Sequence, residues 1–403
     1  MLSQNARALI EASVPVLREH GGAITNCFYG KMFAAHPELK NLFNMGNQQS
    51  GVQQQSLASA LYAYAANIDN QQALAPVISR IVHKHVSVGI RAEHYPIVGK
   101  YLLEGIADTL GAAATPELLA AWGEAYGLLA GAFIAEEQSL YEAKNIEPGQ
   151  CRPVTVLRTQ QESADVTSFY LASADGAPLP SFRPGQYISV TMNVAEWSLK
   201  QLRQYSLSDS PDKDYWRISV KREAATAAQP AGMVSGLMHE VRAGDTLWVG
   251  APCGDFVMDG QSPAPLVLIS AGVGITPMMS MLHASLGDTP ARRVSFLHAA
   301  RSGRHHALRG ELAALNDAHA ALDTHICYEN PDLEDQAGVD FDQAGLLQLT
   351  PLGDDLLPQD GQYYLCGPGP FMQAQRRSLI ARGIPAERIQ HEVFGPDLIG
   401  NLK

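Results

Sequence analysis

Two histidines stand two positions apart in the segment IVHKHVSVG. If this segment is a helix, Ile78, Ile81 and Val82 form an apolar face on it. His85 continues that face at helical spacing, whereas His83 points about 200° away from His85. We therefore expect His85 to face the interior and His83 to lie on the surface. An imidazole in an apolar interior is either an ordinary core residue or a ligand of a metal or of haem iron.

Three other polar residues interrupt apolar helical faces in the same part of the chain. Gln53 comes four residues before Leu57, and Glu137 comes four residues after Phe133. Tyr29 stands in an equally apolar segment. A buried glutamate is rarely tolerated without a partner such as histidine or tyrosine. Any one of these residues could lie on an exposed turn of its helix, but together they indicate a polar pocket inside a helical bundle.

A different chemistry is indicated by the segment LVLISAGVGITPMM, which reads as a buried strand, a glycine turn and a helix. Gly272 and Gly274 permit a close approach of the backbone to a ligand, and we expect Thr276 to cap the helix and Pro277 to begin it. Free amides at a helix N-terminus can bind a pyrophosphate. The spacing is not GxGxxG, so this stretch alone is equally consistent with a simple tight turn. The segment YYLCGPGPFM predicts a second turn at the same edge of the sheet.

The segment RQYSLS could supply three groups that a flavin needs. Arg203 offers a charged fork for a pyrophosphate, Tyr205 a flat ring and Ser206 a hydroxyl. The same residues also fit an ordinary alternating strand with an exposed arginine and a buried tyrosine. The segment by itself does not decide between the two.

These candidate groups require three structural units. The N-terminal part of the chain is rich in alanine and leucine at helical spacing. The middle part has short alternating strands between turn residues, and the C-terminal part alternates buried strands with helices. We therefore expect a multidomain protein with an all-α domain, an antiparallel β-barrel and an α/β domain with a parallel sheet. The expected boundaries are 1–147, 151–262 and 263–403.

Composition limits the partners that this chain can have. Its 403 residues carry a net charge of −12, which argues against a nucleic-acid partner. The five cysteines show no CxxC spacing, and the apolar run at 127–135 is too short to span a bilayer. No signal peptide is recognisable at the N-terminus. We expect a cytoplasmic protein without a membrane span, and nothing implies an obligate protein partner.

Seven motifs in the second half of the chain occur in the order typical of the ferredoxin-NADP reductase superfamily. They are RPGQY, RQYSLS, VKRE, APCGDF, SAGVGITPM, YYLCGPGPFM and HEVFGP. The resemblance implies FAD on the barrel and NADH or NADPH on the α/β domain. The implied FAD residues are Tyr187, Arg203, Gln204, Tyr205, Ser206, Val393, Phe394, Gly395 and Pro396. The implied nicotinamide dinucleotide residues are Gly272, Val273, Gly274, Ile275, Thr276 and Pro277.

The chain as a whole resembles a flavohaemoglobin, a globin fused to such a reductase. The matching segments in the first half are NCFYGKMFAAHPELKNLFNM, QQQSL, KHVSVGIRAEHYPIVGKYLL and WGEAYGLLAGAFIAEEQSLYE. The resemblance implies a globin fold that holds a b-type haem through His85 as the iron ligand. The other implied residues are Phe43 against the haem, Tyr29 and Gln53 on the distal side, Tyr95 and Glu137 behind His85, and Lys84 and Glu392 between the haem and flavin domains.

The activity implied by this resemblance is nitric oxide dioxygenation. Nitric oxide and O2 would give nitrate at the haem, which NADH or NADPH would reduce again through FAD. One alternative is a haem-dependent alkyl or lipid hydroperoxide reductase with a lipid or fatty acid in the distal pocket. A second alternative, a haem-based O2 or redox sensor, is disfavoured because a sensor has no need of a complete reductase.

Overall fold

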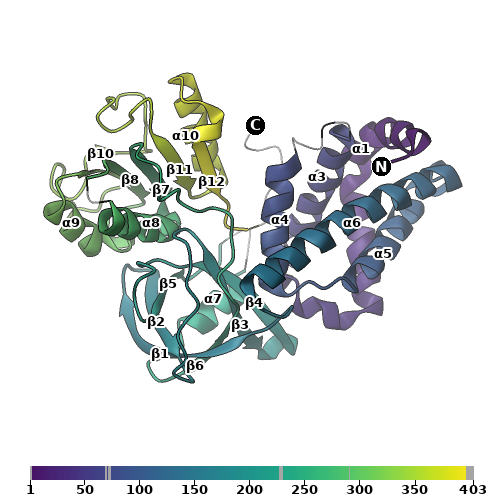
Figure 1. The fold of residues 1–403 in the computed structure, drawn as a ribbon, viewed down its shortest axis with the longest axis horizontal. Coiled ribbons are helices and arrows are strands. Elements are labelled where there is room, and N and C mark those ends of the chain that lie inside the picture. Colours follow the sequence, from purple (N-terminus) through teal and green to yellow (C-terminus); the bar gives the residue numbers. More distant parts are fainter. Residues whose placement is uncertain (1, 69, 71–73, 227–229, 290, 396–403) are drawn as a thin grey trace.

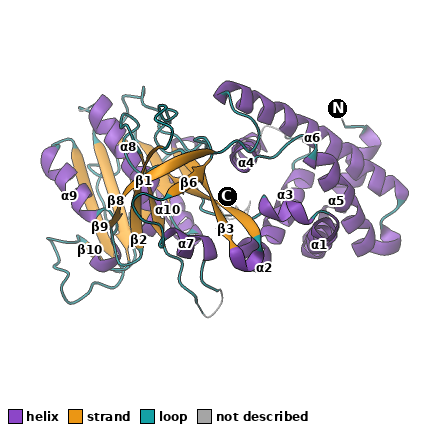
Figure 2. Ribbon diagram, turned by 90° about the horizontal axis from the view of Figure 1, so that it is seen from below, coloured by secondary structure: helices purple, strands orange, loops and turns teal. Residues whose placement is uncertain are grey.

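The computed structural model divides the chain into a helical part, a closed antiparallel sheet and a parallel sheet flanked by helices (Figure 1). In Figure 1 the helical part lies on the right, the antiparallel sheet at the bottom and the parallel sheet at the upper left. Figure 2 shows the same separation, with the strands gathered on one side and most of the long helices on the other. The structure describes residues 2–68, 70, 74–226, 230–289 and 291–395.

The helical part is built around one long helix that packs on three others. Its helices are α1 (Gln4–Ala35), α2 (Met45–Gln49), α3 (Val52–Ala66), α4 (Ala75–Val88), α5 (His94–Leu110) and α6 (Pro116–Lys144). The Ser3 hydroxyl caps α1 by accepting from the Ala6 amide, and the Thr115 hydroxyl caps α6 in the same way from Leu118. Helix α1 packs on α3, α5 and α6, whereas α4 packs on α6. Little contact joins α3 to α4 among the described residues.

Helix α6 is long and apolar enough to cross a membrane by length and composition alone, with a mean hydropathy of 1.5 over its most apolar window. The sequence-based expectation considered only the uncharged run at 127–135. In the structure α6 packs against α1, α4 and α5, and it carries the buried carboxylate of Glu137. Its buried residues thus face other helices of the helical part.

The second part is a six-stranded antiparallel sheet that closes on itself. Its strands are β1 (Arg152–Gln161), β2 (Val166–Ser173), β3 (Tyr187–Val194), β4 (Leu199–Ser206), β5 (Trp216–Lys221) and β6 (Thr246–Val249). They are paired in the order β4-β3-β6-β1-β2-β5. A bridge between Leu207 and Ile218 joins the end of β4 to β5, which closes the barrel. The short helix α7 (Met233–Met238) packs on β3 and β5.

The third part is a six-stranded parallel sheet. Its strands are β7 (Leu266–Ala271), β8 (Val294–Ala300), β9 (Leu322–Tyr328), β10 (Gln343–Ala344), β11 (Gln362–Cys366) and β12 (Ile389–Glu392), and its helices are α8 (Ile275–Asp288), α9 (Arg309–Ala318) and α10 (Gly369–Ala381). The spatial order is β10-β9-β8-β7-β11-β12. The chain adds strands on one side of β7 and then returns to add β11 on the other, so the strand order reverses between β7 and β11. Ligands of open α/β sheets bind at such a reversal, outside the carboxyl ends of the strands.

The sharp turn after α4 depends on Gly89. This residue has a φ of +81°, and a Cβ atom on it would lie 2.6 Å from the Cα of Gly149 in the segment that leads to the barrel. Gly51 has a similar φ of +76° with no atom within 4 Å of its Cβ position. A side chain at position 51 would therefore meet only the backbone strain of a positive φ. A side chain at position 89 would meet the same strain and also a clash with Gly149.

We predict that Gly89→Ala lowers the thermal unfolding midpoint more than Gly51→Ala does. A left-handed non-glycine residue costs about 1–2 kcal/mol at either position, and only Gly89→Ala adds the clash with Gly149. Equal midpoints in a calorimetric scan would mean that residues 148–149 shift without cost and do not fix the junction.

Candidate functional site

The imidazole of His85 is held from one side by two polar groups. Its Nδ1 lies 2.7 Å from Oε1 of Glu137 and 3.1 Å from the hydroxyl oxygen of Tyr95. An ionised carboxylate only accepts hydrogen bonds. Nδ1 of His85 therefore carries the ring proton and donates a hydrogen bond to Glu137. No hydrogen bond engages Nε2 in the part of the chain that the structure describes. The arrangement leaves an oriented imidazole with its Nε2 lone pair available to a ligand.

Glu137 is almost completely buried, at 2% exposure, which makes its partners obligatory. The hydroxyl of Tyr95 donates to the same Oε1 that accepts from His85. Burial and the Glu137 carboxylate raise the pKa of Tyr95, so its hydroxyl stays protonated and continues to donate. The structure therefore confirms that the buried glutamate of α6 has a histidine and a tyrosine as partners.

Sequence reasoning missed two tyrosines that support this arrangement from α6. The hydroxyl of Tyr126 donates to the backbone carbonyl of Tyr95 at 2.7 Å, and that of Tyr141 donates to the carbonyl of Ile90 at 2.8 Å. They fix the start of α5 and the turn that precedes it, and thus the position of the Tyr95 ring. Their spacing on the buried face of α6 with Glu137 was the signal that could have identified them.

Tyr29 of α1, Gln53 of α3 and Phe43 of the segment between α1 and α2 lie together in the helical part. The rings of Tyr29 and Phe43 meet edge to face at 5.7 Å between centroids. Burial raises the pKa of Tyr29 to about 12, and the side chains of Gln53 and Gln48 beside the hydroxyl act in the opposite direction. The hydroxyl of Tyr29 is therefore a hydrogen-bond donor at neutral pH.

The predicted flavin residues lie on two paired strands of the barrel. Tyr187 at the start of β3 is paired with Ser206 at the end of β4. Ser206 is buried at the end of β4. Arg203 and Tyr205 come from the same strand, and burial raises the pKa of Tyr205 and lowers that of Arg203. Gln204 extends its amide to the Ser189 hydroxyl at 3.4 Å.

The C-terminal residues predicted to cover the flavin follow β12. Val393 packs on the core of the third part, whereas Phe394 is 46% exposed and Gly395 has a φ of +122°. An exposed phenylalanine at the end of the described chain fits a ring that covers a bound ligand. Pro396 lies outside the described residues.

The predicted dinucleotide turn lies between β7 and α8 at the reversal of strand order. A Cβ atom on Gly274 would lie 2.3 Å from the carbonyl oxygen of Cys366 at the end of β11, so only glycine fits there. Gly272 has a φ of +54° with open space above it. The turn therefore leaves room for a ligand over the crevice between the two strands.

One expectation about this turn was wrong. Helix α8 begins at Ile275 with Gly274 as its N-cap, and not with a capping Thr276. The hydroxyl of Thr276 donates back to the carbonyl of Val273 at 2.9 Å, and Pro277 lies inside the first turn. The short helical turn Gly272–Gly274 directly precedes α8 and moves its start upstream of the threonine. The free amides at the start of α8 remain, since no side chain caps them.

Comparisons with known proteins bear on all three parts. The globin family matches residues 26–133, the oxidoreductase FAD-binding domain family matches 153–258, and the oxidoreductase NAD-binding domain family matches 268–377. A flavohemoprotein of Chromobacterium violaceum is 52% identical over 98% of this chain and 98% of its own length. The chain belongs to the flavohemoprotein family.

Solved structures agree with this assignment. A flavohemoglobin from Malassezia yamatoensis, crystallised with bound FAD and heme, has a TM-score of 0.87 at 30% identity and covers 98% of this chain and 100% of that one. The FAD/NAD-binding domain of a nitric oxide dioxygenase from Vibrio cholerae has a TM-score of 0.55 at 38% identity, covering 61% of this chain and 99% of that one. The predicted fold class and the cofactor classes haem, FAD and nicotinamide dinucleotide are confirmed.

The helical part of this flavohemoprotein fits a haem in two respects. His85 offers a free Nε2 while its side chain remains 31% exposed. Several large apolar side chains of α3, α4 and the segment between α1 and α2 are only half-buried, as expected for the walls of a pocket that a flat apolar group fills. They are Phe43, Leu57, Ile78 and Ile81.

The helical part and the barrel of the flavohemoprotein meet around the ends of α4 and α6. His83 was expected at the surface, but it is half-buried and accepts a hydrogen bond from the Gly254 amide at 3.2 Å. Burial lowers the pKa of His83, which favours the neutral imidazole that can accept. The expectation failed because the residue opposite the apolar face of α4 packs on a second domain rather than on water. Lys144 at the end of α6 donates to the Pro252 carbonyl at 2.7 Å.

Lys84 and Glu392 lie close enough for their charges to interact, although they come from α4 and β12. The side chain of Lys84 is exposed, and Arg203 of the flavin strand also acts on its charge. Near them, Arg80 approaches Nε2 of His391 at 3.3 Å. The helical part, the barrel and the parallel sheet thus come together around these residues.

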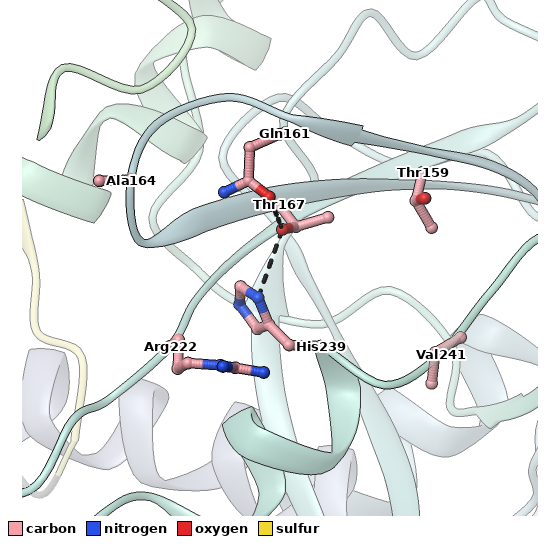
Figure 3. Close-up of a pocket in the computed structure, with 7 residues that line it drawn as sticks. All are labelled: Thr159, Gln161, Ala164, Thr167, Arg222, His239 and Val241. Carbon is pink, nitrogen blue, oxygen red and sulfur yellow. Dashed lines mark hydrogen bonds between the residues drawn. The ribbon is translucent and has the colours of Figure 1, made fainter. Parts of the chain in front are cut away.

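A separate hollow of about 390 Å³ on the barrel contains none of the predicted site residues (Figure 3). His239 donates from Nε2 to the Val220 carbonyl at 2.9 Å, and its Nδ1 lies 3.3 Å from the Thr167 hydroxyl. Burial lowers the pKa of His239, so the ring is neutral and both its nitrogens are engaged. We assign this histidine a structural role at the end of α7.

The two histidines of α4 provide a matched test of ligand identity. We predict that His85→Ala loses haem and retains FAD, because only the His85 imidazole has a free nitrogen and a carboxylate behind it. His83→Ala should retain both, since its nitrogen is bonded to the barrel. The measurement is the ratio of the haem absorbance band to the flavin band in purified protein. Full haem content in His85→Ala would show that another residue holds the iron.

Proposed function

We propose that this flavohemoprotein is a nitric oxide dioxygenase. In this reaction nitric oxide and O2 combine to form nitrate, which requires one electron from NADH or NADPH by way of FAD. The observation that carries the proposal is the bond from His85 to the buried carboxylate of Glu137 in a globin domain joined to a complete reductase. A carboxylate on the far nitrogen makes an imidazole a stronger electron donor to a metal. We further propose His85 as the haem ligand, with Phe43 in contact with the haem.

Bound haem would supply an iron that takes both O2 and the electrons delivered by the reductase. The role of Glu137 is to hold the Nδ1 proton of His85 and keep the ring in one orientation. The role of Tyr95 is to donate to Glu137, which helps to stabilise a carboxylate that has left water. Neither residue needs to transfer a proton during turnover.

Tyr29 and Gln53 supply the polar groups of the pocket on the opposite side. Because the pKa of Tyr29 is about 12, its hydroxyl is a neutral donor throughout the physiological range. A preorganised donor stabilises negative charge that develops on a bound oxygen species. A neutral donor at this position would stabilise a substrate on which negative charge develops.

The reductase residues have separate tasks. We propose that the turn from Gly272 to Pro277 binds the dinucleotide, including Val273 and Ile275, and that Tyr187, the β4 residues from Arg203 to Ser206, and residues 393–396 hold FAD. Lys84 and Glu392 would tune electron transfer at the meeting point of the domains. The likeness to the Vibrio cholerae nitric oxide dioxygenase domain supports this assignment. We take the domains to be 1–147, 151–262 and 263–403, and the location to be the cytoplasm, where NADH and NADPH are regenerated.

The direct test is consumption of nitric oxide by the purified holoenzyme with NADH and O2. We expect consumption that depends on both, with nitrate formed in equal amount to the nitric oxide removed. Consumption that continues without O2, or that gives no nitrate, would contradict the proposal.

Tyr29→Phe should slow this turnover by about 100-fold, because a single preorganised donor of this kind is worth roughly that factor. Reduction of FAD by NADH should stay unchanged, since Tyr29 lies outside the reductase. The two rates are measured by a nitric oxide electrode and by stopped-flow absorbance of the flavin. An undiminished nitric oxide rate would remove Tyr29 from the mechanism.

A further inference from the structure

A second amide side chain, that of Gln48, lies beside the hydroxyl of Tyr29. Gln48 belongs to the short helix α2 and is 9% exposed. The side chains of Gln53 and Gln48 both act to lower the pKa of Tyr29, as hydrogen-bond donors to a phenolic oxygen do. Sequence reasoning identified Gln53 and not Gln48, because a helix of five residues is too short to show an apolar face.

The amide nitrogen of Gln48 lacks an acceptor. Its Nε2 is buried and has no hydrogen-bond partner among the described residues. A buried N–H group without an acceptor is unfavourable, because it has lost its hydration. The oxygen of Tyr29 has two lone pairs that can accept hydrogen bonds. The amide of Gln48 and the hydroxyl of Tyr29 are therefore neighbours with complementary needs.

The side chain of Gln54 determines which end of the Gln48 amide is left for Tyr29. Nε2 of Gln54 donates to the backbone carbonyl oxygen of Gln48 at 3.2 Å and to Oε1 of Gln48 at 3.0 Å. A backbone carbonyl oxygen can only accept, so the nitrogen end of the Gln54 amide must face it. The same nitrogen then requires the oxygen end of the Gln48 amide. Nε2 of Gln48 is consequently the end that remains free.

Contacts at both ends of its first turn hold α2 in place. The side-chain oxygen of Asn44 caps the helix by accepting from the Asn47 amide at 3.2 Å. The Met45 amide donates to Oε1 of Gln201 on β4 at 3.1 Å. A helix of five residues has little stability of its own, so such contacts determine where Gln48 lies.

We infer that Gln48 is a positioning residue for Tyr29, because its amide donates to the phenolic oxygen and leaves the phenolic proton to point into the haem pocket. The inference rests on the proposed function, which takes Tyr29 to be the donor of that pocket. A tyrosine hydroxyl has one proton and two lone pairs, and it rotates to suit its partners. When the amides of Gln48 and Gln53 both donate to the lone pairs, the proton remains for a ligand in the pocket. Gln48 thus contributes to the preorganisation that makes a single donor effective.

The first test is the C–O stretching frequency of carbon monoxide bound to the ferrous holoenzyme, measured by infrared spectroscopy. A donor that points at carbon monoxide lowers this frequency, so Q48L should raise it. Gln49 is the next residue of α2 and is exposed, so Q49L is the matched control and should keep the wild-type frequency. An unchanged frequency in haem-loaded Q48L would overturn the inference. If Q48L does not retain haem, Q48N gives the same comparison, because it keeps the amide but withdraws it by one methylene.

A double variant separates an action through Tyr29 from a direct contact with the ligand. Y29F alone should raise the C–O frequency, and adding Q48L to Y29F should raise it no further. A second shift as large as that of Q48L alone would mean that the amide contacts the ligand itself. That result would overturn the positioning role.

The second readout is the rate at which O2 leaves the ferrous holoenzyme, measured by stopped-flow absorbance. Q48L should raise this rate by about fivefold, the factor expected from the loss of one neutral hydrogen bond, and Q49L should leave it unchanged. Equal rates in wild type and Q48L would contradict the inference. Neither readout involves nitric oxide, so failure of the dioxygenase proposal would appear separately as an absence of nitrate formation.

Discussion

The hydrogen bond from His85 to Glu137 is the interaction on which the helical part depends. A carboxylate at 2% exposure is tolerated only because donors meet it, and an unpaired charge at that depth would cost several kcal/mol. The donors come from α4 and α5, and the carboxylate comes from α6, so one polar contact fixes three helices relative to one another. The same contact sets the tautomer of His85 and directs its Nε2 away from Glu137. The hydrogen bond between His85 and Glu137 therefore serves both the stability of the helical part and the orientation of the imidazole.

The junction between the helical part and the barrel combines an apolar cluster, formed by Val86, Tyr141, Tyr187 and Cys253, with hydrogen bonds to backbone groups. Gln201 of the barrel donates to the Lys40 carbonyl at 3.1 Å, and its Oε1 accepts from the Met45 amide at 3.1 Å. His83 and Lys144 engage backbone groups of the barrel from α4 and α6. Bonds to backbone atoms specify a position without requiring a particular partner side chain. They hold His83 and Lys144 against the barrel, the part of the chain that matches the FAD-binding family.

The sequence allowed the three-part fold and most members of the candidate site to be predicted, because periodicity and burial act locally. His85, Glu137 and Tyr29 each interrupt an apolar helical face, and a buried polar group must find a partner. The start of α8 was wrong because a short helical turn at Gly272 competes with the capping preference of Thr276, and the backbone path decides between them. The role of His83 depends on a second domain that packs over its helix.

Helix α6 contacts both His85 and the barrel. Glu137 and Lys144 are seven residues apart, which on an α-helix is about 10 Å and nearly two full turns, so they lie on roughly the same side. The first holds the haem-ligand candidate and the second holds the barrel at Pro252. Because the helix is continuous from Pro116 to Lys144, a displacement of the barrel contact would be transmitted as a rigid movement to the carboxylate. The imidazole of His85 and the barrel are thus positioned by one structural element.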